Sequence, residues 1–140
     1  MTDLPIQAPR PPLPDLLMTI FLRLVALGTL WFALMIWADL IGYHHGGAGR
    51  FDLLDADMKA ARGTLAVLYP VAAVGLWLRG AWGPVIWGVA AIMEIGLQQA
   101  MPGTFEIDPL KVALVSLIAL IYLLLRLWTL LTKPPVNEAR

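Results

Sequence analysis

Long apolar stretches separated by short polar segments dominate the chain. A helix that crosses a lipid bilayer needs about 20 mostly apolar residues, at about 1.5 Å each. Four stretches reach this length, at about residues 15–43, 58–78, 81–101 and 109–132. The pattern therefore predicts an all-α integral membrane protein, a four-helix bundle that crosses the bilayer four times.

The four stretches make one domain, residues 15–132, between two tails. The first tail, residues 1–14, is rich in proline and favours the polyproline II conformation, and the second covers residues 133–140. We interpret the first tail as a stiff spacer, with a motif that docks onto a partner as the alternative.

Prolines and short connections refine this plan. Pro70 lies in the middle of the second stretch, where it removes one backbone donor and displaces the carbonyl of Ala66, so a kink is expected. Only Arg79 and Gly80 separate the second stretch from the third, which predicts a tight antiparallel hairpin. Pro109 suits the first turn of the fourth helix.

The distribution of lysine and arginine predicts the orientation, because cytoplasmic loops carry an excess of both. With four crossings the two termini share one side, which holds six of these residues: Arg10, Arg23, Arg79, Arg126, Lys133 and Arg140. The other side holds four, which are Arg50, Lys59, Arg62 and Lys111. Both termini are therefore predicted in the cytoplasm, and the protein in a bacterial inner membrane. Trp77, Trp82 and Trp128 would form an aromatic belt at the cytoplasmic interface.

Composition supports the lipid bilayer as the surrounding solvent and excludes several functions. Hydrophobic residues make up 59% of the chain and charged residues 14%, whereas soluble domains carry about 45–50% and about 25%. The formal net charge is zero, which argues against nucleic acid as a partner. The absence of cysteine excludes disulfides and thiolate chemistry. The glycines at 46, 47 and 49 lack the Lys-Ser/Thr of a phosphate-binding loop, so no nucleotide is expected.

Glu94 is the most informative single residue, because it lies well inside the third apolar stretch. Ionisable side chains within membrane helices are costly and usually face other helices. Helical spacing places Glu94 on one stripe with Trp87, Ala90, Ala91, Gln98 and Met101, and this stripe holds the small and polar residues. Val85, Val89 and Ile92 fall on the opposite face. The stripe with Glu94 is therefore predicted to face the other helices.

Counting residues from the predicted outer helix ends places several polar side chains at similar depth. This intramembrane polar layer would hold Asp39, Tyr69, Glu94, Gln98 and Ser116, with Arg62 as a possible partner. The layer would be either a proton- or cation-responsive site, or the floor of a small ligand pocket, or a set of interhelical hydrogen bonds that fix the packing.

Other candidates for chemistry are weaker. His44 and His45 could hold a metal or haem, but adjacent side chains on a helix diverge by about 100° and no third ligand is evident. Ser116 is the only serine and has no histidine beside it, so no nucleophilic triad is expected. The sequence identifies no cofactor.

Residues 50–87 carry a family resemblance. This segment places Arg-Phe-Asp after the first helix, Gly-Leu-Trp at the end of the second and Trp-Gly-Pro-Val-Ile-Trp at the start of the third. It resembles a family of uncharacterised four-helix membrane proteins from alphaproteobacteria, which implies no activity. The order of spans, with a longer first loop and a tight second hairpin, is also similar to that of DoxX-type proteins, by topology alone.

Three functions remain open. The first is a non-catalytic accessory, assembly or regulatory subunit of a membrane complex, with another membrane protein or a second copy as its partner. The second is a small transporter-like protein that responds to protons or cations at Glu94. The third is a redox-linked subunit near quinone or haem, for which His44 and His45 would be the candidate ligands.

Overall fold

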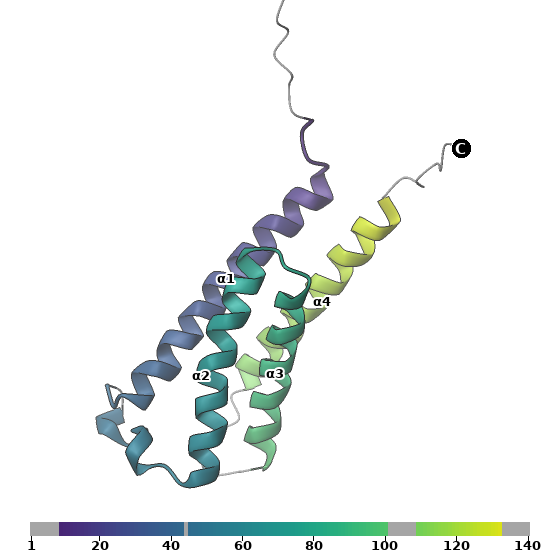
Figure 1. Ribbon diagram of the computed structural model, residues 1–140. Coiled ribbons are helices and arrows are strands. Elements are labelled where there is room, and N and C mark those ends of the chain that lie inside the picture. The colour runs from purple at the N-terminus through teal and green to yellow at the C-terminus, as the bar shows by residue number, and fades with distance from the viewer. Residues whose placement is uncertain (1–8, 44, 101–108, 133–140) are drawn as a thin grey trace, which may run out of the picture.

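The computed structural model describes residues 9–43, 45–100 and 109–132, and within these ranges the chain is all-α (Figure 1). The four helices that the apolar pattern predicts are confirmed. They are α1 (Leu13–Leu40), α2 (Ala56–Trp77), α3 (Trp82–Ala100) and α4 (Pro109–Thr132), with two short 3-10 turns, η1 (His45–Gly47) and η2 (Phe51–Leu53), between α1 and α2.

The first helix differs most from its predicted bounds. It begins at Leu13, two residues early, and ends at Leu40 instead of Tyr43. Gly42 follows with a φ of 85°, a conformation that stops the helix and that glycine adopts without strain. The third helix was predicted to include Met101, which lies outside the described residues. Helix α3 ends at Ala100, the last described residue before this gap.

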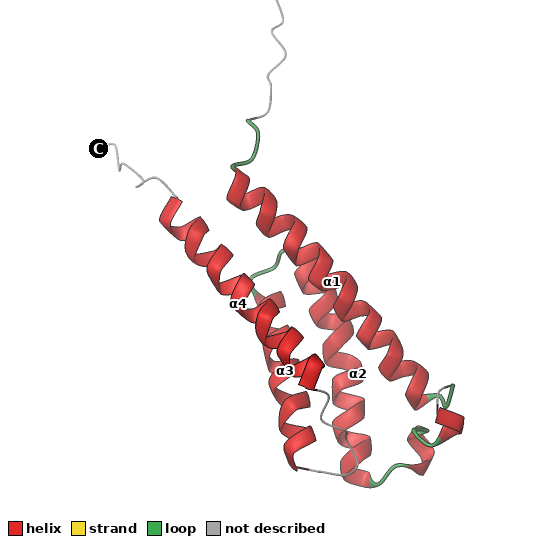
Figure 2. Ribbon diagram, turned by 180° about the vertical axis from the view of Figure 1, so that it is seen from behind, coloured by secondary structure: helices red, strands yellow, loops and turns green. Residues whose placement is uncertain are grey.

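The helices run alternately up and down in one bundle. The start of α1, the α2–α3 turn and the end of α4 all lie toward one end, whereas η1 and η2 lie at the other (Figures 1 and 2). Both α1 and α4 extend beyond the α2–α3 turn, and α4 begins level with the middle of α3. The helix ends are therefore not level, although the sequence-based estimate of depth assumed that they were.

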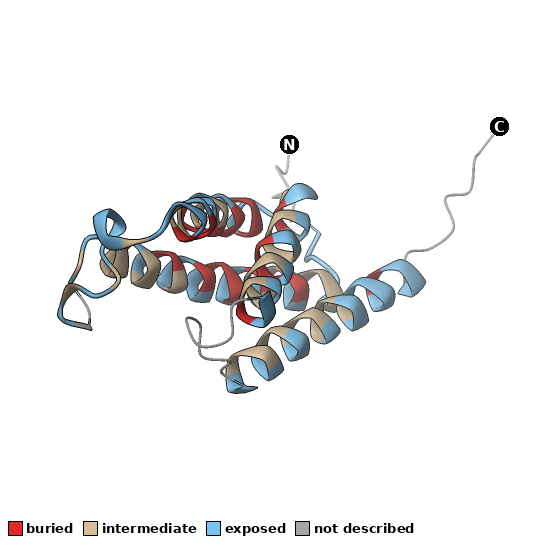
Figure 3. Ribbon diagram, turned by 90° about the horizontal axis from the view of Figure 1, so that it is seen from below, coloured by how far each residue is buried: buried red, intermediate tan, exposed pale blue. Residues whose placement is uncertain are grey.

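The buried residues belong mainly to α1, α2 and α3 (Figure 3). One apolar cluster contains Met18, Leu22, Val25, Ala26 and Leu76, and a second contains Ala33, Leu65, Tyr69 and Ala90. By contrast, Thr129 is the only buried residue among those of α4. The fourth helix therefore lies along the outside of a three-helix core.

Two glycines allow the backbones of α2 and α3 to touch near their turn. A Cβ added to Gly83 would lie 2.4 Å from the carbonyl carbon of Gly75, and one added to Gly75 would lie 2.7 Å from Cα of Gly83. No side chain fits at either position. These small residues serve the packing inside the chain, because both glycines are buried.

The α2–α3 turn is the tight hairpin that the sequence spacing predicts, and the structure shows that it closes with a Schellman motif. The N–H of Gly80 donates to the carbonyl of Gly75 at 2.9 Å, and the N–H of Arg79 donates to that of Leu76 at 3.1 Å. Arg79 takes the left-handed position of the motif, with a φ of 56°, although glycine is the usual residue there.

Helix α2 continues through Pro70, and a side chain from α1 replaces the missing backbone donor. Pro70 has no N–H for the carbonyl of Ala66. The indole Nε1 of Trp37 donates to this carbonyl instead, at 3.0 Å. The proline thus creates an acceptor on α2 that an α1 side chain satisfies.

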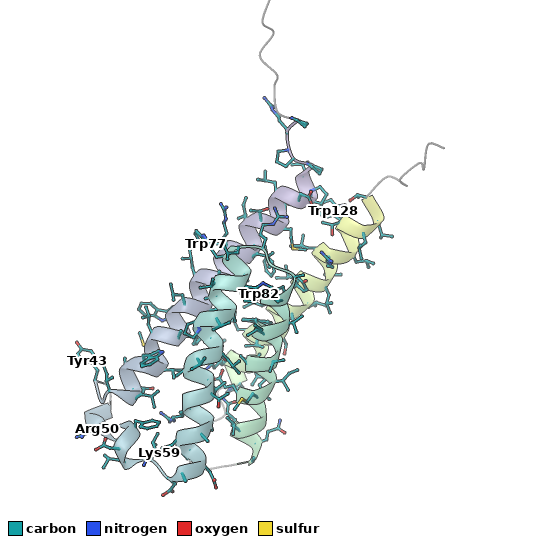
Figure 4. The ribbon with its side chains drawn as sticks, viewed as in Figure 1. Tyr43, Arg50, Lys59, Trp77, Trp82 and Trp128 are labelled. Atoms are coloured by element: carbon teal, nitrogen blue, oxygen red, sulfur yellow. The ribbon has the colours of Figure 1, made fainter. Side chains whose placement is uncertain are left out.

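Three helices, α1, α2 and α4, are long and apolar enough to cross a membrane. Glu94, Gln98 and Gln99 lower the hydropathy of α3, which is not among the three. Trp77, Trp82 and Trp128 lie toward the end with the hairpin turn, and Tyr43, Arg50 and Lys59 toward the other (Figure 4). Arg23 lies 5.4 Å from the ring centroid of Trp77, a cation–π contact between α1 and α2.

Candidate functional site

The carboxylate of Glu94 joins three helices. The hydroxyl of Tyr69, on α2, donates to Oε2 of Glu94, and the ammonium of Lys111, on α4, donates to Oε1 and forms an ion pair. The side chains of Glu94 and Lys111 are only 13% and 26% exposed, so the ion pair is largely buried inside the bundle. We call Tyr69, Glu94 and Lys111 the polar centre.

Helix α1 contributes an aromatic wall to the polar centre. The ammonium of Lys111 lies 4.8 Å from the ring centroid of Phe32, which is a cation–π geometry. The four helices of the bundle therefore meet around one carboxylate and one ammonium. Because each charge in a low-dielectric interior needs its partner, the polar centre links α4 to the other helices.

The sequence stripe that contains Glu94 faces the bundle, as predicted. Ala90, Ala91 and Gln98 are buried, and most of the Glu94 side chain is buried as well. On the opposite face Val85, Val89 and Ile92 are exposed.

Among the predicted layer residues, Tyr69 and Glu94 are in direct contact. Ser116 does not join them: it is exposed, and its hydroxyl donates to the carbonyl of Val112 at 2.8 Å. The prediction for Ser116 was wrong because α4 begins level with the middle of α3. This offset brings the level of Glu94 close to the first turn of α4.

Lys111 is the site residue that sequence reasoning missed. It was assigned to the outer surface because it lies two residues after Pro109. One signal pointed to it: a cation in the first turn opposes the helix dipole, so it needs another source of stabilisation. Glu94 supplies it.

Asp39 and Arg62 form part of a different polar cluster, near the loop between α1 and α2. A Cβ added to Gly49 would lie 3.4 Å from Nη1 of Arg62 and 3.6 Å from Cβ of Asp39. Asp39 follows Phe32 by seven residues, and Arg62 precedes Tyr69 by seven, so each lies about 10 Å along its helix from the polar centre. Placing Asp39 in the layer with Glu94 was therefore incorrect.

Gln98 lies one helical turn from Glu94 and is buried. Its amide oxygen has no hydrogen-bond partner among the described residues. Glu94, Gln98 and Lys111 line a common cavity of about 10 Å³, which is near the lower limit for one water molecule. A small cavity and a buried amide therefore lie next to the polar centre on α3.

No group of three histidine, aspartate or glutamate side chains that could hold a metal occurs in the part of the chain that the structure describes. His44 and the side chain of His45 lie outside that part, so the prediction of a redox-linked subunit stays a prediction.

The chain belongs to a family described as a family of unknown function (DUF6163), which matches residues 16–133. This match covers all four helices except the first residues of α1. No curated protein and no solved structure matches the chain. The predicted alphaproteobacterial source and the DoxX-type likeness stay predictions.

Proposed function

We propose that the protein crosses a bacterial inner membrane four times, with both termini in the cytoplasm. Helices α1, α2 and α4 have the length and hydropathy for a crossing. Helix α3 returns beside α2 after a short turn and packs against it through Gly75 and Gly83. As the hairpin partner of a crossing helix, α3 would cross as well, with the charge of Glu94 neutralised by Lys111.

Within this membrane the protein acts as a non-catalytic accessory, assembly or regulatory subunit of a larger complex. The observation that carries this proposal is the engagement of Glu94: each of its carboxylate oxygens is bound by a side chain of its own chain. Glu94 is the side chain best placed for chemistry, and both of its oxygens are used to hold helices together. The described segments between helices are short, which leaves little room for a soluble catalytic site.

The surface for the neighbouring subunit is the outward face of α4. Large apolar residues are exposed along its length, namely Leu117, Leu120, Leu124 and Leu127. The partner is another membrane protein or a second copy of the chain.

Site-directed photo-crosslinking in intact membranes tests this proposal. A photoreactive residue at Leu124, on α4, is expected to give one discrete crosslinked species, whereas the same residue at Leu27, exposed on α1, serves as the matched control. A complex of the same composition should persist in mild detergent. Migration as a lone monomer, with no crosslink from Leu124, would contradict the proposal.

A second candidate function is a response to protons or cations at Glu94. A small cavity beside Glu94, and an amide oxygen of Gln98 that has no hydrogen-bond partner among the described residues, favour it. Together they leave room for about one water molecule next to the carboxylate. Proton flux into liposomes that contain the purified protein, and its loss in Glu94→Gln, would support this function. Equal flux in both proteins would exclude it.

A further inference from the structure

The space between α1 and α4 contains two neighbouring cavities. The larger has a volume of about 310 Å³, and the smaller about 200 Å³. Phe21, Val25, Trp87 and Ile118 line both. On α1 the lining of the larger cavity runs from Phe21 to Phe32, which is about 16 Å along the helix axis. The space is therefore elongated, and its volume is in the range of small-molecule sites.

The larger cavity is apolar along most of its length and polar at one end. Lys111 and Tyr69 of the polar centre line that end, beside Phe32. An ammonium group has three N–H donors. Within the described residues, that of Lys111 contacts one carboxylate oxygen of Glu94 and the ring of Phe32. A donor therefore remains for an acceptor placed in the cavity.

Two glycines keep this space open. Gly28 lines the larger cavity and Gly88 the smaller one. A Cβ added to either glycine would meet nothing within 4 Å. Glycine in a helix interior costs about 0.5–1 kcal/mol relative to alanine, and neither glycine is required by helix contacts as Gly75 and Gly83 are.

We propose that this space is a binding site for a neutral lipophilic molecule with one hydrogen-bond-accepting end, of the acyl ester class. The apolar body would lie between α1 and α4, and the carbonyl would accept from Lys111. A carboxylate is disfavoured, because Glu94 already neutralises Lys111 and would repel a second negative charge. The site does not depend on the partner subunit proposed above.

The depth of the polar end excludes a bilayer phospholipid as the occupant. Glu94 follows Trp82 by 12 residues and precedes Ala100 by six, which are about 18 Å and about 9 Å along α3. A charged headgroup at that depth would lie in the apolar interior at a high cost. A neutral lipid can enter completely, so its carbonyl can reach Lys111.

Tryptophan quenching tests the proposal on the full chain in nanodiscs of phosphatidylcholine. The probe is methyl 12-bromododecanoate, because bromine quenches tryptophan on contact and Trp87 lines both cavities. We expect a saturable quenching component that is lost in Trp87→Phe. Methyl laurate should compete with the probe at roughly tenfold lower concentration than dodecane, which lacks the acceptor, and also better than the laurate anion. Equal competition by dodecane would overturn the proposal.

Cavity-filling variants provide the matched comparison. Gly28→Leu should abolish the saturable component, whereas Gly63→Leu should keep it, since Gly63 has the same open space and lines neither cavity. If Gly28→Leu does not fold, Gly88→Leu takes its place. Saturable quenching that is unchanged in the folded cavity-filling variant contradicts the site.

Nanodiscs made from a phosphatidylcholine with brominated acyl chains distinguish the two sources of an acyl chain. Weak quenching of Trp87 by the brominated phospholipid, or quenching that methyl laurate relieves, supports a site for a neutral ester. Quenching that methyl laurate does not relieve would mean that bilayer lipid fills the space, and the proposal would fail.

Discussion

At the scale of single residues, the backbone contact between α2 and α3 depends on the absence of side chains at two positions. The sequence shows glycines at 75 and 83, but glycine is common in membrane helices and does not by itself identify a contact. The structure separates the glycines by function. Gly75 and Gly83 touch another backbone, whereas Gly28 and Gly88 border open space.

Gly83→Ala is therefore expected to destabilise the protein. The added Cβ would lie 2.4 Å from backbone atoms of Gly75, and backbone cannot move aside as a flexible side chain can. Overpacking of this kind costs about 1–3 kcal/mol or more. Unfolding in mixed micelles of dodecylmaltoside and SDS measures the loss. Gly88→Ala, in the same helix with open space, is the control and should be neutral or stabilising; an equal loss in both variants would refute the argument.

At the scale of helices, the prediction of four elements succeeded because long apolar runs are a strong signal. The tight turn at Arg79 and Gly80 also followed from the spacing. The relative heights of the helices did not follow, because residue counting treats all helix ends as level. Because of that error, Asp39 and Ser116 were predicted in the wrong place and Lys111 was not identified. The prediction of the stripe around Glu94 was correct, since it depended only on helical periodicity.

Pro70 shows how an interruption in one helix becomes a contact with the next. Its effect on the Ala66 carbonyl was predictable, but the donor was not, since it comes from α1. Trp37→Phe keeps the aromatic ring and removes this hydrogen bond. We expect a loss of about 1 kcal/mol, because the Ala66 carbonyl would remain without a donor.

The free energy of unfolding in mixed micelles measures the effect of Trp37→Phe. Trp31→Phe is the matched control, because Trp31 is exposed on α1 and has no hydrogen bond within the described residues. A larger loss for Trp31→Phe than for Trp37→Phe would contradict the role of Trp37.

At the scale of the whole molecule, the proposed topology rests on α3, the one described helix of the four that is not long and apolar enough by itself to count as a crossing. The chain contains no cysteine, so single cysteines can report sidedness without background. Leu78→Cys lies at the hairpin, Ala48→Cys in the first loop and Leu131→Cys at the end of α4, and all three positions are exposed.

With four crossings, an impermeant thiol reagent applied to intact cells should label Ala48→Cys, whereas Leu78→Cys and Leu131→Cys should react only after permeabilisation. If α3 does not cross, the cysteines at 78 and 131 would react from opposite sides. The comparison therefore decides between three crossings and four.

The central claim concerns the polar centre: the ion pair of Glu94 and Lys111 holds α4 against the other helices. A double-mutant cycle tests it most directly, with Glu94→Gln, Lys111→Met and the double variant compared by unfolding in mixed micelles. Breaking a buried pair leaves an uncompensated polar or charged group, so each single variant should lose about 3 kcal/mol. The double variant should lose less than the sum, with a coupling energy of at least about 1 kcal/mol. The losses from Lys59→Met and Glu94→Gln should be additive, since Lys59 lies near Phe51 in the first turn of α2, well before Tyr69. Additive losses for Glu94 and Lys111 would contradict the account.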